Sequence, residues 1–134
     1  MTLLPCYLSH VMIDETAQSQ VVIISERDGT RRFPITIGVL EATAIDRGVK
    51  QQRFPRPLTH DLAMQLIESL GGSLRAVRIT DIQEQTFFAQ LALSDRDGRE
   101  VIVDCRPSDA LALLVRRNGT PLLVADTVLA EAGG

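Results

Sequence analysis

The sequence is poor in aromatic residues and in lysine. Among 134 residues it has no Trp, one Tyr and four Phe, and Lys50 is the single Lys among 14 basic residues. A core built from Val, Ile, Leu and Ala is therefore expected. An aromatic-rich strand that stacks bases, as in common RNA-binding sheets, is excluded as well. Phe87-Phe88 is the one candidate pair, and the alternation of a strand buries at least one of its members.

Cysteine is scarce too, and the familiar catalytic motifs are missing. Cys6 and Cys105 make no disulfide framework, and no spacing resembles a zinc site. The sequence has no Gly-rich phosphate loop, His-Glu-x-x-His motif or Ser nucleophile elbow. The apolar beginning lacks a basic leader and is too short for a signal peptide, and no apolar run approaches the roughly 20 residues of a membrane span. These absences predict a soluble cytoplasmic domain with reduced thiols.

Length and charge set two further limits. A chain of 134 residues without a linker or low-complexity stretch is expected to form one domain, 1–134, that can bury a core. The net charge of -3 gives no whole-molecule attraction for nucleic acid. Binding to nucleic acid would therefore depend on a local basic patch or on a bound cation.

An internal repeat organises the residues that are present. Ser25-Glu26-Arg27-Asp28-Gly29 recurs as Ser94-Asp95-Arg96-Asp97-Gly98, and the Asp-Gly pair suits a hairpin turn. Apolar runs that favour strands flank each turn, and each unit then leads into an acid-Ala-x-Ala-aliphatic segment, 41–45 and 109–113. The sequence therefore predicts an α+β fold: a mixed, largely antiparallel sheet built from two β-β-β-α repeats that a pseudo-two-fold axis relates.

The repeat halves cover about 5–53 and 74–134, and a central helix over about 59–70 joins them. Thr59 is a good N-cap for this helix, and Gly71-Gly72 ends it. Its apolar stripe at helical spacing consists of Leu62, Ala63, Leu66, Ile67 and Leu70.

The second repeat helix, the third helix expected in all, is predicted from Pro107 to Arg117. Proline suits its first turn, and arginines near its end complement the helix dipole. A short strand is expected at 121–124, and 130–134 are expected to be frayed.

Two stretches, 55–62 and 103–110, carry the candidate chemistry. Each sets Arg beside Pro and then places an acid at the expected start of a helix. The candidate residues are His60, Asp61, Asp104, Arg106 and Asp109. Carboxylates can hold Mg²⁺ or Mn²⁺, His can bind metal or transfer a proton, and Arg can hold phosphate. Glu41 occupies the position of Asp109 in the first repeat and could reach the same pocket as a further metal ligand.

A purely structural interpretation of these residues is equally coherent. Asp61, Asp109 and Glu41 each stand where a helix dipole favours an acid. His60 could be an ordinary hydrogen-bonded histidine. Arg106 could bridge Asp104 and Asp109 in a salt-linked turn, with no ligand involved.

A basic segment precedes the first candidate stretch. Arg47, Lys50, Arg53 and Arg56 recur at a spacing of three and lead directly to His60. Such a segment beside an acidic site could let an acidic protein bind a polyanion, with Lys50, Arg53, Arg56 and Arg106 as substrate-binding residues. The alternative is a solvated face whose charges have no ligand.

The combination of motifs resembles the bifunctional nuclease domain family. The resemblance runs over about 35–128 and rests on motifs in a fixed order: Ile37-Gly38, Glu41-Ala42-x-Ala44-Ile45, the two Arg-Pro stretches and Pro121-Leu122-Leu123-Val124. Two departures occur: Gln85-Thr86-Phe87-Phe88-Ala89 stands where members have Gly-Thr-Phe-Tyr-Ala, and Cys105 where they have Ala. The resemblance implies cleavage of DNA and RNA.

These observations lead to two hypotheses. The first is a metal-dependent nuclease of low sequence specificity. In it Asp61, Asp104 and Asp109 hold Mg²⁺ or Mn²⁺, His60 assists proton transfer, and Arg106 with Arg56 neutralises phosphate charge. The second is a non-catalytic oligomeric module whose Arg and Asp corner binds a protein partner or a small anionic ligand. A homo-oligomer, dimer or higher, is expected in either case.

Overall fold

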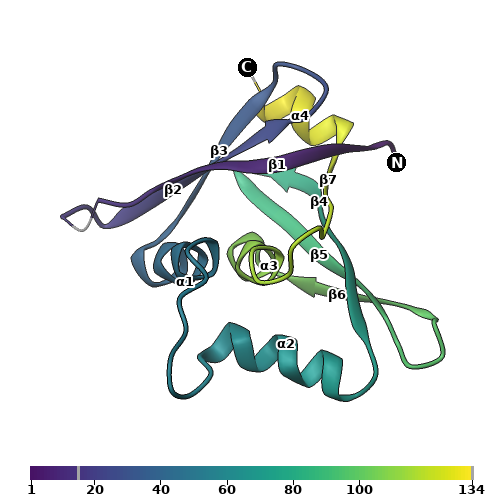
Figure 1. Ribbon diagram of the computed structural model, residues 1–134. Coiled ribbons are helices and arrows are strands. Elements are labelled where there is room, and N and C mark those ends of the chain that lie inside the picture. The colour runs from purple at the N-terminus through teal and green to yellow at the C-terminus, as the bar shows by residue number, and fades with distance from the viewer. Residues whose placement is uncertain (15, 134) are drawn as a thin grey trace.

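A single open sheet of seven strands forms the framework of the molecule (Figure 1). The computed structural model describes residues 1–14 and 16–133. The strands are β1 (Leu3–Met12), β2 (Ser19–Glu26), β3 (Arg32–Gly38), β4 (Ser73–Gln83), β5 (Thr86–Ser94), β6 (Glu100–Cys105) and β7 (Leu122–Ala125). Their order is β3-β2-β1-β7-β4-β5-β6, and only β4 and β7 pair in parallel among these strands. The predicted α+β fold with a mixed, largely antiparallel sheet is confirmed.

Four helices pack on this sheet within the described residues. They are α1 (Val39–Val49), α2 (Thr59–Ser69), α3 (Pro107–Leu114) and α4 (Asp126–Ala132). Helices α1 and α3 lie against each other on one side of β1, with α2 beyond them, and α4 lies on the other side (Figure 1). Helix α3 packs against both α1 and α2, which brings the first turns of the three helices together.

The strand-strand-strand-helix unit occurs twice, as the repeat in the sequence predicts. Strands β1, β2 and β3 lead into α1, and strands β4, β5 and β6 lead into α3. The two three-stranded units stand on either side of β7 in mirrored order. Superposition of the halves by a pseudo-two-fold rotation stays a prediction.

The sheet curves strongly, which gives the domain its core. Phe33 of β3 stacks on Phe87 of β5 with ring centroids 5.3 Å apart, although four strands separate β3 from β5 in the sheet. Aliphatic side chains fill the space inside the curve, as the scarcity of aromatic residues predicts, among them the fully buried Ile24, Ile45, Ile79, Leu111 and Leu129.

Helix α2 is turned differently from the prediction. Leu62, Leu66 and Leu70 are 46%, 56% and 72% exposed, and Met64 is the buried residue of the helix. The reason is that Asp61 and Glu68 form ion pairs with Arg116 and Arg117, which draws the opposite flank of the helix inward. The three leucines of the predicted apolar stripe therefore face outward, while Ala63 and Ile67 of the same stripe pack against the core.

The N-terminus of α2 also differs. Thr59 is the first helical residue and Leu58 is the N-cap, so the predicted Thr59 cap is wrong. The Asp61 carboxylate accepts the backbone N–H of Leu58 at 3.2 Å instead.

The end of the chain is more ordered than expected. Residues 130–132 belong to α4, which buries Val128 and Leu129, so the prediction of fraying is wrong there. Gly134 lies outside the described residues. Helix α3 ends at Leu114 rather than Arg117. The described residues contain no helix that is both long enough and apolar enough to traverse a bilayer.

Candidate functional site

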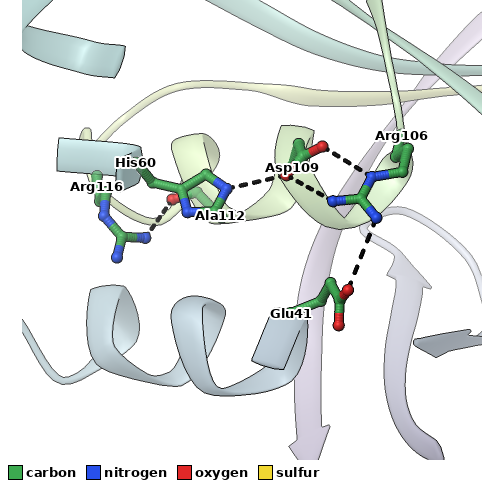
Figure 2. A network of polar contacts seen from close by, with 6 residues as sticks. All are labelled: Glu41, His60, Arg106, Asp109, Ala112 and Arg116. Carbon is green, nitrogen blue, oxygen red and sulfur yellow. Dashed lines mark hydrogen bonds and ion pairs between the residues drawn. The ribbon is translucent and has the colours of Figure 1, made fainter. Parts of the chain in front are cut away.

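Four of the predicted residues meet in one polar cluster, Glu41, His60, Arg106 and Asp109 (Figure 2). His60 Nε2 lies 3.0 Å from Asp109 Oδ1. Arg106 donates from Nε to Asp109 Oδ2 at 3.0 Å and from Nη2 to Oδ1 at 3.3 Å. Its Nη1 lies 3.7 Å from Glu41 Oε1. The result is a continuous chain from imidazole through carboxylate and guanidinium to a second carboxylate.

Three helix starts position these side chains. Asp109 lies in the first turn of α3, three residues after the N-cap Arg106. His60 lies in the first turn of α2, and Glu41 in the first turn of α1. The positive end of each dipole favours the acids there, so the structural interpretation of Asp109 and Glu41 applies together with the functional one. An acid that only stabilises its own helix has no need of other helix starts nearby. The proximity of the three first turns is therefore what favours a functional site.

The cluster lies between solvent and core. His60, Glu41 and Asp109 are half-buried, whereas Arg106 is two-thirds exposed. Glu41, Arg106 and Asp109 line a cleft whose wall also includes Asp104 and the aromatic pair Phe87-Phe88, and His60 lies behind Asp109. Phe87 is half-buried and Phe88 is exposed, as strand alternation predicts. A ligand can therefore reach Arg106 first.

The environment of Asp109 keeps it ionised. Partial burial raises its pKa, but hydrogen bonds and charge from Arg106 and His60 outweigh burial and hold the pKa below its ordinary value. The same hydrogen bond to Asp109 raises the pKa of Arg106. The pair therefore carries opposite full charges at neutral pH.

A pH dependence of stability follows from Asp109. Its pKa is lower in the folded state, so its contribution to the free energy of unfolding is fully present above its ordinary pKa of about 4 and is lost as the pH falls through the folded value. Solvent screening limits this contribution to about 1 kcal/mol or less. Urea unfolding of the protein and of Asp109→Asn should differ at pH 6 and converge near pH 2. A difference that persists unchanged at pH 2 would contradict the assignment.

Asp61 lies apart from the cluster although it follows His60 directly. Its Oδ1 accepts from Arg116 Nε at 2.9 Å, and Arg116 also donates to the Ala112 carbonyl at 2.7 Å. The Arg116 side chain is only 8% exposed. The Asp61–Arg116 ion pair therefore joins the first turn of α2 to the end of α3. This contact fixes the position of the turn from which His60 reaches Asp109.

Asp104 and Cys105 end β6 beside the cluster. Asp104 is exposed and lines the cleft with Glu41 and Asp109. Burial, followed by the charges of Asp109 and Asp104, raises the pKa of the Cys105 thiol to about 11. The thiol is therefore protonated at neutral pH and is not a ready nucleophile.

The basic segment divides between two environments. Arg47, Arg53 and Arg56 line a second pocket together with Arg116. Lys50 pairs instead with Asp46 at 2.8 Å, within α1 and the residue that follows it. The spacing of three along the sequence therefore does not bring all four side chains to one place.

The acidic side chains at the site could provide only a few of the ligands that a divalent cation needs. Across residues 1–14 and 16–133, no three His, Cys, Asp or Glu side chains gather in a geometry that could hold a metal ion. Asp61 is committed to Arg116, and the Arg106 guanidinium lies between Glu41 and Asp109. Mg²⁺ commonly uses one or two carboxylates together with substrate phosphate and water. The carboxylates lining the cleft fit this mode of binding, but they do not fit a site built from protein ligands only.

Sequence reasoning missed the role of Arg116. The sequence places it near a helix end, where it was interpreted as complementing the dipole. Its partner Asp61 is 55 positions away along the chain, and no local spacing signals such a contact.

The fold and the cluster define a class: a small α+β domain with an accessible His, Arg and carboxylate site at converging helix starts. The family model of the Bifunctional nuclease domain matches residues 22–134, and the chain belongs to this family. The resemblance drawn from the sequence motifs is confirmed.

Curated relatives support this membership. An uncharacterized protein of Mycobacterium tuberculosis (strain ATCC 25618 / H37Rv) is 42% identical over 123 residues, which are 92% of this chain and 72% of that protein. Bifunctional nuclease 1 of Arabidopsis thaliana is 26% identical over 107 residues, 78% of this chain and 33% of that protein. Bifunctional nuclease 1 of Oryza sativa subsp. japonica is 24% identical over 105 residues, 76% of this chain and 32% of that protein. The chain thus spans about one third of the plant proteins.

Proposed function

We propose that this protein hydrolyses phosphodiester bonds of DNA and RNA with low sequence specificity. The observation that carries the proposal is the His60–Asp109–Arg106 arrangement, in which Asp109 and Arg106 line the cleft. It combines a proton-transfer group, an orienting carboxylate and a phosphate-binding cation. Membership in the bifunctional nuclease family and the names of the plant relatives support nucleic acid as the substrate.

Each residue of the cluster has a distinct role in this proposal. In this proposal the Nε2–H of His60 donates a hydrogen bond to Asp109 Oδ1, which leaves Nδ1 to take a proton from an attacking water. The water oxygen bonds to phosphorus, the ester P–O bond breaks, and the leaving oxygen takes up a proton from solvent water. His60 then returns its proton to solvent. Arg106 is exposed and has five N–H donors, so it can bind phosphate oxygens while it stays beside Asp109.

A divalent cation is the second part of the proposal. Mg²⁺ or Mn²⁺ would bind to one or two of the carboxylates Glu41, Asp104 and Asp109, with the substrate phosphate completing its ligands. When bound, the cation would supply additional neutralisation of phosphate charge. Asp61 is left out of this ligand set because Arg116 holds it.

A specific observation favours the alternative of a non-catalytic binding module. Asp109 and Glu41 already have Arg106 as their partner, so their charges are balanced without any metal. In that case the exposed Arg106 would bind a partner protein or a small anion, and the pairing with His60 would serve stability.

A cleavage assay separates the two functions. Single- and double-stranded DNA and RNA are incubated with Mg²⁺, Mn²⁺ or EDTA, with the protein and with an identically purified Asp104→Asn, Asp109→Asn double variant. The nuclease proposal expects cleavage that EDTA removes and that falls at least a hundredfold in the double variant. Equal cleavage by both proteins would indicate a contaminant or other residues. No cleavage by either would favour the binding module.

We also propose that two copies of the chain associate. Helix α2 and edge strand β6 run in opposite directions along one side of the molecule. At the start of α2, His60 contacts Asp109, which follows the end of β6. Just after the end of α2, Gly71 lies against Arg96, which precedes the start of β6: a Cβ on Gly71 would lie 2.9 Å from Arg96 Nε. The exposed large apolar side chains on and directly after α2 and on β6 are Leu62, Leu66, Leu70, Val101, Ile102 and Val103. Such a patch beside an unpaired strand edge suits a second copy.

Charge repulsion tests this association. Leu66→Lys places a charge in the patch, so a dimer of the unaltered protein should become monomeric in size-exclusion chromatography with light scattering. Leu40→Lys is the matched control, because Leu40 is 80% exposed on α1, outside the patch. A monomeric unaltered protein at every concentration tested would refute the proposal.

A further inference from the structure

We propose that a second pocket, the arginine pocket, binds a nucleoside phosphate of the same strand that the polar cluster cleaves. The pocket is lined by Arg47, Arg53, Arg56 and Arg116 with Phe54. It is formed mainly by the α1–α2 connection, at the left of Figure 1, and by the end of α3. The choice of nucleic acid as ligand rests on the proposed function.

The charge of this pocket is opposite to that of the whole chain. Four guanidinium groups line it, and Asp61 is the one acid among the described lining residues. Asp61 is already paired with Arg116. Arg53 and Arg56 are exposed and form no ion pair with a carboxylate in the described part of the chain. Two free cations in a concave site attract a polyanion despite a net charge of -3.

The pocket also offers surfaces for a base. The Phe54 ring is 42% exposed, and the Arg47 guanidinium lies 5.4 Å from its centroid. A ring backed by a guanidinium presents a π-face on which any base can stack. Gln51 and Gln52 add amide groups to the lining. Gln51 holds a left-handed φ of 53°, which is unusual for a residue with a side chain and places a sharp turn at this wall.

The arginine pocket and the polar cluster are neighbours joined through one helix turn. His60 points to Asp109, whereas the next residue, Asp61, points to Arg116 in the pocket lining. Adjacent Cα atoms are only about 3.8 Å apart. Arg106 and Arg116 stand at opposite ends of α3, ten residues and hence about 15 Å apart along the helix axis. A strand with one phosphate at Arg106 can therefore reach the pocket with a nucleotide two or more positions further along. This arrangement requires an extended strand, so single-stranded nucleic acid is the favoured ligand.

Salt-dependent binding measures the predicted contacts without reference to cleavage. Fluorescence anisotropy follows a labelled single-stranded oligonucleotide in EDTA at several salt concentrations, and a gel confirms that the probe stays intact. An Arg53→Ala, Arg56→Ala double variant should bind more weakly, and its slope of log K against log salt should fall in magnitude by about 1.4, since each lost phosphate contact accounts for about 0.7 on single strands. Phe54→Ala should weaken binding about tenfold and leave the slope unchanged.

The control is Arg75→Ala, because Arg75 is exposed on β4 outside the pocket lining. Unaltered slope and affinity in the double variant, or an equal change in Arg75→Ala, would overturn the proposal. Competition with adenosine monophosphate identifies the source of the nucleoside phosphate. If the labelled oligonucleotide is displaced only by a far higher concentration of adenosine monophosphate than of unlabelled oligonucleotide, the ligand is a strand. If similar concentrations of the two displace it, the ligand is a free nucleotide. Lost cleavage in the Asp104→Asn, Asp109→Asn variant has no bearing on this result, so the two proposals can fail separately.

Discussion

Replacement of His60 by Ala should lower the rate of phosphodiester cleavage by about 10²- to 10⁴-fold, the usual contribution of a positioned acid-base group. His60 Nε2 lies 3.0 Å from the Asp109 carboxylate, which fixes the ring beside the same carboxylate that Arg106 binds. Removal of the ring leaves Arg106 and the carboxylates in place, so substrate should still bind. The fall should therefore appear in kcat, with KM little changed, in initial-rate measurements on an oligonucleotide.

The sequence provides a matched control, since it contains only two histidines. His10 lies on β1 and contacts Ser9 at 3.1 Å, outside the polar cluster. His10→Ala should keep the full rate. Equal losses in the two variants would point to damage of the fold, and full activity in His60→Ala would remove His60 from the mechanism.

Replacement of Leu111 by Ala should cost about 2–5 kcal/mol of the free energy of unfolding. Leu111 is fully buried on α3, the helix that carries Asp109 in its first turn and contacts both β4 and β5. Truncation leaves a cavity under this helix. For a domain of this size the melting temperature should fall by roughly 10 °C, measured by calorimetry or by circular dichroism.

An exposed leucine gives the comparison for this variant. Leu40→Ala, on α1, removes the same atoms from a side chain that is 80% exposed, so its effect should stay within about 0.5 kcal/mol. A similar loss for both variants would contradict the placement of α3 in the core.

The fold was predictable where local signals repeat. The two Asp-Gly turns, each between apolar runs, specify hairpins by local chemistry alone, and the observed β2–β3 and β5–β6 pairs follow them. The order of three strands and then a helix is likewise repeated in the sequence. The motifs around His60 and Asp109 then identified the family through their order along the chain.

Features that depend on distant contacts were not predictable. Asp61 and Glu68 on α2 pair with arginines about 50 positions away, so the spacing of the apolar stripe alone could not show that its leucines face outward. Helix α4 is short, and it is stabilised by the burial of Val128 and Leu129 rather than by the helix propensity of its residues. The same limit applies to the site. Asp61 and Asp109 look equivalent in sequence, but Asp61 pairs with Arg116 whereas Asp109 contacts His60 and Arg106.

Histidine NMR tests most directly whether nucleic acid reaches the polar cluster. The protein is labelled with ¹⁵N-histidine, and a short single-stranded oligonucleotide is added in EDTA, so a contaminating nuclease has no influence on the result. With two histidines in the sequence, the spectrum contains one pair of ring signals from each. The proposed site predicts that the His60 signals shift in a saturable manner while those of His10 stay in place. Saturable binding that leaves the His60 signals unmoved would contradict it.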